Sequence, residues 1–244
     1  MCGIVGYIGK RDAYSIVIKG LKRLEYRGYD SAGIMLHDGK DLKVSKTKGK
    51  VTDLEEVSAK DNNFFGSIGM GHTRWATHGA PNDVNAHPHP STEGDLVLIH
   101  NGIIENYDVL RKELTNHGYV FRSETDTEVL VHLIDDIRKN EKVDLAEAVR
   151  LALHSVVGAY AIVVMSKDKP NQLVAARKSS PLVVGIGTEN DFYLASDATP
   201  IVEYTKRVVY LEDEEIAVVD LVEGLKIFNI KNQEKTPYIQ QLEM

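Results

Sequence analysis

The chain has 244 residues, of which 43% are hydrophobic and 27% are charged, and its formal net charge is −7. This composition is typical of a globular protein with a substantial core, while the negative charge and scattered basic residues argue against a nucleic-acid partner. No apolar run approaches the ~20 residues that span a bilayer, and the start Met-Cys-Gly-Ile-Val-Gly lacks the features of a signal peptide, so we expect a cytoplasmic protein without a membrane partner.

Short apolar runs rich in β-branched residues predict strands along most of the chain. They cover residues 4–8, 33–37, 67–71, 96–100, 159–165, 173–177, 182–186, 192–195, 208–211, 215–220 and 225–230. Apolar residues at helical spacing predict helices over 13–25, 107–116, 126–138 and 145–153. The polar segments 38–50 and 57–63 are predicted to be surface loops.

The order of these elements indicates an α+β fold. Strands and helices do not alternate regularly, which favours sheets covered by helices over a doubly wound parallel sheet. Short turns within 159–187 contain Lys-Asp-Lys-Pro-Asn and Ser-Ser-Pro, and they favour antiparallel meanders. We expect one domain over residues 1–231. Residues 232–244 lose clear periodicity and are predicted to be a C-terminal tail or linker.

The single cysteine, Cys2, stands at the second position and is followed by the small residue Gly3. Removal of Met1 would give Cys2 both a thiol and an α-amine, with reference pKa values of ~8.5 and ~7.7–8.0. One residue could then supply the nucleophile and its base. The alternative is that Met1 is retained and Cys2 is a small buried residue of the first strand. Position alone leaves both alternatives open.

The dipeptide Asn101-Gly102 follows the apolar run that ends at His100. An amide side chain beside an unhindered main-chain N–H is a suitable oxyanion hole for acyl transfer. Asn-Gly is also a common signal for a tight turn, and this second interpretation is the more frequent one for the dipeptide alone.

The glycine-flanked segment 71–79 is predicted to contain a mobile loop after a strand. Arg74 carries the planar fork that suits a carboxylate, and Thr77 and His78 could add donors beside it. Trp75, the only tryptophan, could form an apolar wall. A structural ion pair of Arg74 and a core position of Trp75 are the alternative.

Asp126 stands at the start of a predicted helix and is a candidate ligand for an ammonium group. Capping boxes formed by Ser123 with Asp126, or by Thr125 with Glu128, explain the same residues structurally. A carboxylate there is also favoured by the helix dipole.

Two further patterns do not carry a cofactor. The run His-Pro-His-Pro at 87–90 lacks closely spaced acidic or cysteine ligands, so no metal is expected. Gly-Ile-Gly at 185–187 lacks the third glycine of a dinucleotide fingerprint.

Taken together, the motifs resemble the class II, N-terminal nucleophile glutamine amidotransferase family over essentially the whole chain. The matching stretches are Cys-Gly-Ile-Val-Gly at 2–6, Arg-Gly-Tyr-Asp-Ser-Ala-Gly at 27–33, Gly-His-Thr-Arg-Trp-Ala-Thr-His-Gly at 71–79, His-Asn-Gly at 100–102 and Thr-Asp-Thr-Glu at 125–128. The stretches 25–33 and 72–79 are similar to the branch that transfers the glutamine nitrogen to fructose 6-phosphate. The phosphoribosyl branch would carry a glutamine-type residue at Tyr29 and Tyr-Ser-Thr after Arg74.

This resemblance implies a four-layer αββα sandwich of the N-terminal nucleophile hydrolase type, with mainly antiparallel sheets. It implies that Cys2 attacks the amide carbon of L-glutamine, and that no cofactor takes part. The implied roles of the other matched residues are oxyanion stabilisation by Asn101 and Gly102, α-carboxylate binding by Arg74, Thr77 and His78, an apolar wall at Trp75, and α-amino binding by Asp126.

The implied partners are sugar isomerase domains that receive the ammonia, and the resemblance also allows a homodimer of the full-length protein. Those domains would need a few hundred further residues, so we expect this chain to be the isolated glutaminase half. Two alternatives stay open: a glutaminase domain of the phosphoribosyl type, and a catalytically silent regulatory module on the same fold.

Overall fold

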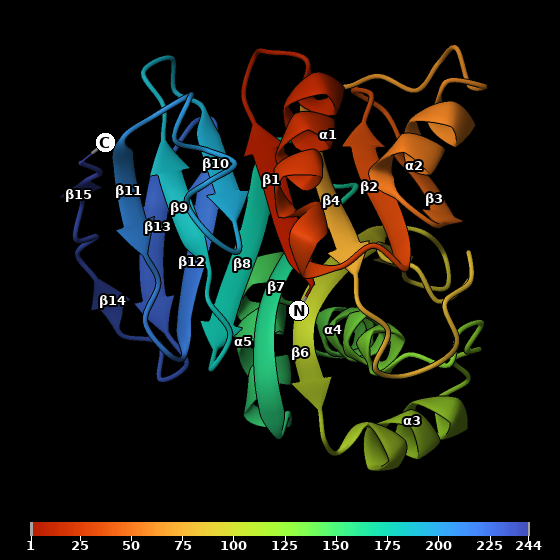
Figure 1. Cartoon of the computed structure of the whole chain (residues 1–244). Coiled ribbons are helices and arrows are strands. Elements are labelled where there is room, and N and C mark those ends of the chain that lie inside the picture. The colour runs from red at the N-terminus through yellow and green to blue at the C-terminus, as the bar shows by residue number, and fades with distance from the viewer. Residues whose placement is uncertain (1, 244) are drawn as a thin grey trace.

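A computed structural model describes residues 2–243. Over this part of the chain it contains two β-sheets and five α-helices, arranged in four layers (Figure 1). Every pairing between the named strands is antiparallel. The predicted α+β class and the αββα sandwich implied by the resemblance are therefore confirmed.

The first sheet, sheet A, contains the N-terminal strand near its middle. Its eight strands within residues 2–243 are, in spatial order, β15 (Gln240–Gln241), β11 (Arg207–Tyr210), β9 (Val183–Ile186), β10 (Phe192–Ala195), β1 (Gly3–Ile8), β4 (Ile68–Arg74), β2 (Ser31–His37) and β3 (Leu42–Lys48). The position of β1 between β10 and β4 places the start of the chain inside a fully paired sheet.

The second sheet, sheet B, is built from later parts of the chain. Its seven strands within the described residues are, in spatial order, β14 (Glu234–Lys235), β13 (Gly224–Asn229), β12 (Glu215–Asp220), β8 (Gln172–Lys178), β7 (Gly158–Ser166), β6 (Leu96–Ile104) and β5 (His89–Pro90). The longest pairing joins β6 and β7 over nine residue pairs, from Leu96↔Ser166 to Ile104↔Gly158. This pairing holds Asn101 and Gly102 in place along β6.

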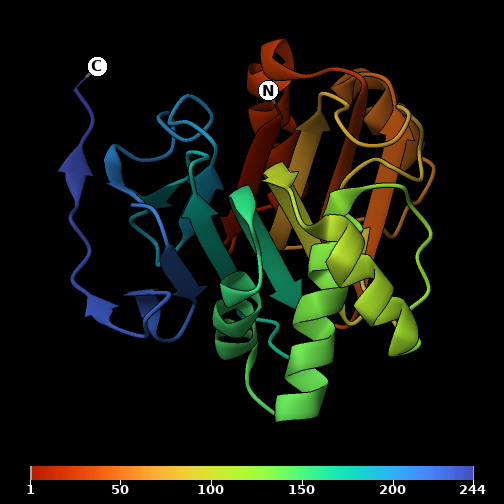
Figure 2. The same cartoon turned by 90° about the horizontal axis from the view of Figure 1, so that it is seen from below.

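Helices cover the outer face of each sheet. Sheet A is covered by α1 (Ala13–Leu24) and α2 (Val51–Ser58), and a short 3-10 helix, η1 (Glu25–Arg27), follows α1. Sheet B is covered by α4 (Asp126–Glu141) and α5 (Leu145–His154), with α3 (Tyr107–Asn116) packed on α4. Figure 2 shows α3, α4 and α5, in green, on the opposite side of the molecule from the red α1.

The strands of the middle layers are apolar on both faces because each face meets a different core. In β1, Ile4 and Ile8 point into the core between the sheets, whereas Val5 and Tyr7 pack with α1. Other strands repeat this alternation with a period of two. Strands buried on both faces read as nearly continuous apolar runs, which is why most of them were predictable.

Side-chain N-caps fix the starts of α1 and α4. Asp12 caps α1 by accepting a hydrogen bond from the Ser15 N–H at 3.1 Å. Thr125 caps α4 by accepting from the Glu128 N–H at 3.3 Å, which is half of one predicted capping box. The Glu128 carboxylate instead accepts from residues 122 and 123, so the reciprocal half of that box is not formed.

The prediction that 38–50 is a surface loop is wrong. Residues 42–48 form β3, an edge strand whose lysines and polar side chains hide the apolar alternation. The helix α2 was not predicted, since it is short and buries only Val51, Leu54 and Ser58. Both elements pack at the periphery of sheet A, where half-exposed positions carry little apolar signal.

Four other strands differ from expectation. Strand β6 continues through Asn101 and Gly102 to Ile104 instead of ending at His100. The antiparallel meander predicted over 159–187 holds for β7 and β8 but not for β9, which crosses to sheet A. Within 232–243, β14 pairs with β13 and β15 pairs with β11. Among residues 2–243, no helix is both long and apolar enough to cross a membrane.

Candidate active site

The predicted nucleophile lies where the two sheets face each other. Cys2 immediately precedes β1 of sheet A, and Asn101 and Gly102 lie on β6 of sheet B. A cavity of about 300 Å³ opens beside the thiol. Its lining residues are Cys2, Arg27, Trp75, Thr77, Asn101, Gly102, Ile103, Ser180 and Pro181. Residues from opposite layers of the fold thus share one cavity.

The main chain of Trp75 holds the Cys2 thiol. The Trp75 N–H donates to Sγ at 3.3 Å, and the Trp75 carbonyl oxygen lies 3.6 Å from the same sulfur. Burial is the largest influence and leaves the pKa of the Cys2 thiol raised overall, and the Trp75 N–H and the Arg74 charge oppose it only in part. The N–H and the guanidinium therefore favour the thiolate, which is the nucleophilic form. The expected removal of Met1 falls outside the described residues.

Asn101 and Gly102 face the cavity from within β6. The Asn101 Nδ2 donates to the Cys2 carbonyl oxygen at 3.1 Å, which ties the amide to the nucleophile's own main chain. Gly102 has φ +127°, and a Cβ built there would lie 2.1 Å from the Ala159 carbonyl oxygen. Only glycine fits at this position. The chain therefore continues as β6 through this dipeptide, and both Asn101 and Gly102 line the cavity.

The segment 75–81 contributes Trp75 and Thr77 to the lining of the cavity, and the Arg74 side chain holds its later residues. The guanidinium is buried and donates to the carbonyl oxygens of His78, Gly79 and Ala80, the last through Nη1 at 3.4 Å. Arg74 therefore does not line the cavity in this structure. The Arg74 guanidinium is instead bound by carbonyl oxygens of residues 78–80, part of the segment that is predicted to contain a mobile loop.

Asp30 and Gly28 fix the near end of this segment. The Asp30 Oδ2 accepts from the Ala76 N–H at 3.0 Å, and the Asp30 N–H donates to the Arg74 carbonyl oxygen at 3.0 Å. A Cβ on Gly28 would lie 2.7 Å from the Arg74 carbonyl carbon. The Arg-Gly-Tyr-Asp motif thus packs directly against the chain that carries Trp75.

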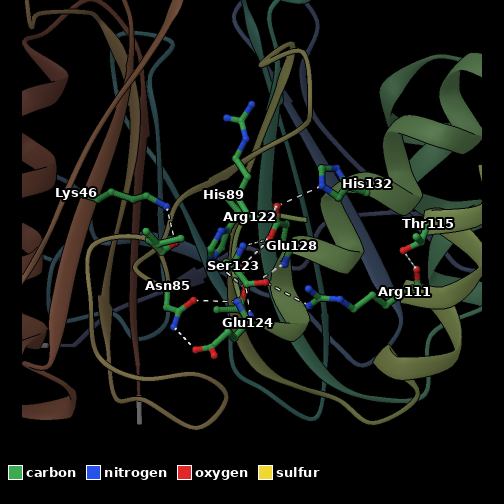
Figure 3. Close-up of polar contacts among 12 residues, drawn as sticks. Lys46, Asn85, His89, Arg111, Thr115, Arg122, Ser123, Glu124, Glu128 and His132 are labelled. Carbon is green, nitrogen blue, oxygen red and sulfur yellow. Dashed lines mark hydrogen bonds and ion pairs between the residues drawn. The ribbon is translucent and has the colours of Figure 1, made fainter. Parts of the chain in front are cut away.

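Asn85 fixes the far end of the segment (Figure 3). Its Nδ2 donates to the Ala80 carbonyl oxygen at 2.9 Å and to the Glu124 carboxylate at 3.1 Å, while its Oδ1 accepts from the Glu124 N–H at 3.0 Å. Lys46 holds the adjoining chain by donating to three carbonyl oxygens of residues 84, 86 and 88. Burial lowers the pKa of Lys46 to about 8.

A larger cavity, of about 540 Å³, is lined by Lys46, His89 and Glu128 among others, and it does not contain the thiol. Burial alone would raise the pKa of Glu128, but hydrogen bonds from His132 and from residues 122 and 123 lower it to about 2. The His132 Nε2 lies 3.4 Å from a carboxylate oxygen of Glu128, and Figure 3 marks this contact with a dashed line. Main-chain and side-chain groups of the protein thus already bind Lys46 and Glu128. Within residues 2–243, this cavity shares no lining residue with the one beside Cys2.

The other predicted binding residues lie at different depths. Trp75 is 47% exposed and its ring meets Tyr29 edge-on at 5.8 Å between centroids. Thr77 is exposed and lines the cavity. His78 is half-buried and its ring packs on Tyr107, so it does not line the cavity. The alternative of a core tryptophan is therefore wrong.

Asp126 is buried at the first position of α4 and its Oδ2 accepts from the Ile104 N–H at 2.8 Å. It does not line the cavity, but it is close enough to raise the pKa of the Cys2 thiol. Asp126 and Arg74 thus shift the pKa of the Cys2 thiol in opposite directions.

The histidines of the His-Pro-His-Pro run are buried beneath the site. His87 stacks on His72 with 4.0 Å between ring centroids, and the His89 Nε2 lies 3.2 Å from the Thr125 hydroxyl. Burial lowers the pKa of His87 and His89 well below the ordinary value, so the rings are neutral. Within residues 2–243, no group of three or more His, Cys, Asp or Glu is placed to hold a metal ion.

Four lining residues were not predicted as site residues: Arg27, Ile103, Ser180 and Pro181. Arg27 belongs to a motif that supports the family resemblance, and it pairs with Asp197 at 2.6 Å. The Ser-Ser-Pro turn that contains Ser180 was recognised only as a connection between strands. Its place beside the thiol depends on β9 crossing to sheet A, and no local pattern signals that crossing.

The arrangement suits acyl transfer. A thiol, an amide N–H donor and a glycine whose main chain is accessible meet at one cavity, with an arginine and an aspartate nearby. A thiolate can form an acyl intermediate, and preorganised N–H donors stabilise the oxyanion that precedes it.

Comparisons with known proteins agree with this chemistry. A model of the glutamine amidotransferase domain family matches residues 72–203. The whole chain is 61% identical to part of a glutamine–fructose-6-phosphate aminotransferase (isomerizing) of Bacteroides thetaiotaomicron, and 52% identical to part of one of Chlorobaculum tepidum. The chain spans 40% of the length of each of these relatives.

Solved structures with the same fold include a glutamine phosphoribosylpyrophosphate amidotransferase from B. subtilis. It superposes with a TM-score of 0.79 at 29% identity, covering 94% of this chain and 49% of that one. A glutamine aminotransferase class-II domain protein from Silicibacter pomeroyi has a TM-score of 0.60 at 16% identity, covering 94% of this chain and 99% of that one. The second likeness concerns the fold alone.

Proposed function

This chain belongs to the glutamine amidotransferase domain family, and from this premise we propose that it hydrolyses the side-chain amide of L-glutamine to glutamate and ammonia. The observation that carries the proposal is the meeting of Cys2, Asn101 and Gly102 at one cavity. A nucleophile and the donors for its oxyanion must lie within a few ångströms of one carbonyl carbon, and these residues come from two different sheets.

In the proposed reaction the Cys2 thiolate attacks the amide carbon of glutamine. The carbonyl π electrons move to the oxygen, which accepts hydrogen bonds from the Asn101 amide and the Gly102 N–H. Collapse of this tetrahedral species breaks the C–N bond, and the leaving nitrogen takes a proton to depart as ammonia. Water then hydrolyses the γ-glutamyl thioester. The α-amine of Cys2, free once Met1 is removed, serves as the base that takes and returns the proton.

Arg74, Thr77, His78 and Asp126 are proposed to hold the two charged ends of the glutamine backbone, with Trp75 as an apolar wall. The guanidinium of Arg74 is occupied by three carbonyl oxygens of residues 78–80. We infer that the substrate carboxylate replaces some of these contacts, because a charge-assisted bidentate pair is stronger than neutral hydrogen bonds. This exchange would couple carboxylate binding to movement of the segment 75–81.

At the level of the whole protein, we propose that the ammonia is delivered to fructose 6-phosphate by sugar isomerase domains beyond this chain. The support is the identity of 61% and 52%, over the whole chain, with relatives named glutamine–fructose-6-phosphate aminotransferase. Residues 1–231 would be the glutaminase domain and 232–244 the connection to those domains. A cytoplasmic location and a full-length homodimer remain part of this proposal, and the free thiol of Cys2 suits a reducing compartment.

The test is glutamine turnover by the wild type beside Cys2→Ala. We expect glutamate release by the wild type and none above background from the variant, which should unfold at the same temperature as the wild type. The intact mass of the active protein should lack one methionine. Activity that survives in Cys2→Ala would disprove the mechanism. A wild type that lacks Met1 and binds glutamine without hydrolysing it would favour the silent regulatory module.

A further inference from the structure

The buried histidine His72 contacts the proposed oxyanion hole from the opposite sheet. His72 lies on β4 of sheet A and is fully buried. Its Nε2 is 3.0 Å from the carbonyl oxygen of His100 and 3.0 Å from Oδ1 of Asn101. A carbonyl oxygen can only accept a hydrogen bond, so Nε2 must carry the proton and donate to both oxygens.

The orientation of the Asn101 amide is fixed independently at its other end. Its Nδ2 lies 3.1 Å from the carbonyl oxygen of Cys2, which also can only accept. The amide nitrogen therefore faces Cys2 and the amide oxygen faces His72. Two separate partners thus require the same orientation, and an amide turned by 180° would lose both hydrogen bonds.

The environment of His72 keeps its ring in one state. Burial lowers the pKa of His72 to about 3 and outweighs the hydrogen bonds to Asn101 Oδ1 and to the His100 carbonyl oxygen, which raise that pKa; the charge of Arg74 acts in the same direction as burial. The ring is therefore neutral, with its one proton on Nε2. It stacks on His87 at an interplanar angle of 10°, and the His87 Nδ1 accepts from the His100 N–H at 3.3 Å. Within residues 2–243, Nδ1 of His72 has no hydrogen-bond partner.

From this geometry we propose that His72 is a positioning residue of the oxyanion hole, acting through Asn101. The inference rests on the proposed glutaminase function. The N–H of His72 holds Oδ1, so that Nδ2 can donate one hydrogen to the Cys2 carbonyl and turn the other toward the oxyanion. A rotated amide would instead bring Oδ1, a partial negative charge, against the developing negative charge.

The experiment compares two variants of nearly equal shape, His72→Met and His72→Gln. Methionine removes the donor, and we expect kcat for glutamine to fall about 10²-fold, as for a misplaced catalytic group, with KM little changed. Glutamine restores an N–H at a similar reach and should recover most of the lost kcat. Equal activity of the two variants would overturn the proposal. A wild type without glutaminase activity would instead refute the proposed function.

Two further measurements separate positioning from general damage to the fold. Alkylation of Cys2 by iodoacetamide displaces iodide and forms no oxyanion, so His72→Met should be alkylated at the wild-type rate. In an Asn101→Ala background, His72→Met should cause no additional loss of kcat. Slower alkylation, or a further loss in the double variant, would show that His72 does not act through Asn101.

The wild-type protein offers a test that does not depend on folding of a variant. Nitrogen-15 NMR of the His72 imidazole should show a neutral ring protonated at Nε2 at about pH 5, where an ordinary histidine is mostly charged. A ring protonated at Nδ1, or a cationic ring, would overturn the assignment.

Discussion

The cavity beside Cys2 has two unlike sides. Its floor, formed by Cys2, Asn101 and Gly102, belongs to or directly adjoins paired strands, and the residue Asn101 is only 9% exposed. Its rim, formed by residues 75–81, contains no helix or strand, and Trp75 is 47% exposed. The floor is held by side chains from two sheets. The rim is held at its ends by Asp30 and Asn85, and between them by the Arg74 guanidinium, which donates to the carbonyl oxygens of residues 78–80.

This contrast suggests a division of labour between charge stabilisation and substrate capture. Donors that stabilise a transition state act best when they need no reorganisation at the moment of reaction, and the floor has that property. A rim that opens and closes admits the substrate and then excludes water. Damage to the floor should therefore lower kcat, and damage to the rim should mainly raise KM.

The largest expected effect comes from breaking the floor. Replacing Asn101 by Ala removes the proposed donor to the oxyanion, and kcat should fall about 10²–10³-fold with little change in KM. Steady-state glutamate release measures this. Asn101→Asp is the matched control of equal size, and it should be at least as inactive because it places a negative charge at the oxyanion. A variant Asn101→Ala with wild-type kcat would remove this residue from the floor.

The next effect concerns the residue beneath the rim. Arg74→Ala should lower kcat/KM for glutamine, mostly by raising KM. The lost stabilisation should be about 2–3 kcal/mol, the size of a hydrogen bond to a charged group. Arg74→Lys keeps the charge but loses the planar fork, so it should restore only part of the loss. If Arg74→Ala instead lowered kcat and left KM unchanged, the division between floor and rim would fail.

Acid should lower the free energy of unfolding through protonation of the buried His72, which contacts Asn101. The folded-state pKa of His72 is about 3, below its ordinary value of 6.5. Between these values the unfolded chain binds the additional proton, so the free energy of unfolding falls on acidification by about 1.4 kcal/mol per pH unit for this group. Urea unfolding from pH 7 to pH 4 measures the slope, and His72→Gln should show a smaller one. An identical slope would mean that His72 titrates normally when folded.

The smallest effect is expected at the far end of the rim. Asn85→Ala removes the hydrogen bonds to Ala80 and Glu124, which should cost about 1 kcal/mol of unfolding free energy. Limited proteolysis should then cut the rim faster, while kcat stays nearly unchanged. Asn85→Asp keeps the acceptor for the Glu124 N–H but sets a second carboxylate against that of Glu124, so it should lose more than Asn85→Ala. A large fall in kcat for Asn85→Ala would show that the rim also shapes the floor.

Much of the fold was predictable because the central strands are buried on both faces. Strands such as β1, β7 and β12 read as nearly continuous apolar runs. The edge strand β3 and the short helix α2 were missed, because half-exposed elements tolerate lysine and glutamate where a core strand would need apolar residues. The passage of β6 through Asn101 and Gly102 was also missed, since local statistics favour a turn at that dipeptide.

The site shows the same limit. Cys2, Trp75, Thr77, Asn101 and Gly102 were selected from the sequence and all line one cavity. The contact of His72 with Asn101 joins residues 29 positions apart on different sheets, and only the stacking of the two layers creates it. Long-range contacts of this kind have no local signal in a single sequence.

The short strands β14 and β15 have a consequence for how the molecule behaves in solution. They pair with β13 and β11, which would otherwise be the outermost strands of the two sheets. An unpaired edge strand exposes a row of N–H and C=O groups that can template association with another chain, and very short edge strands blunt this hazard. One segment of the chain thus covers one edge of each sheet, and a fragment trimmed before residue 232 should self-associate through these two newly exposed edges.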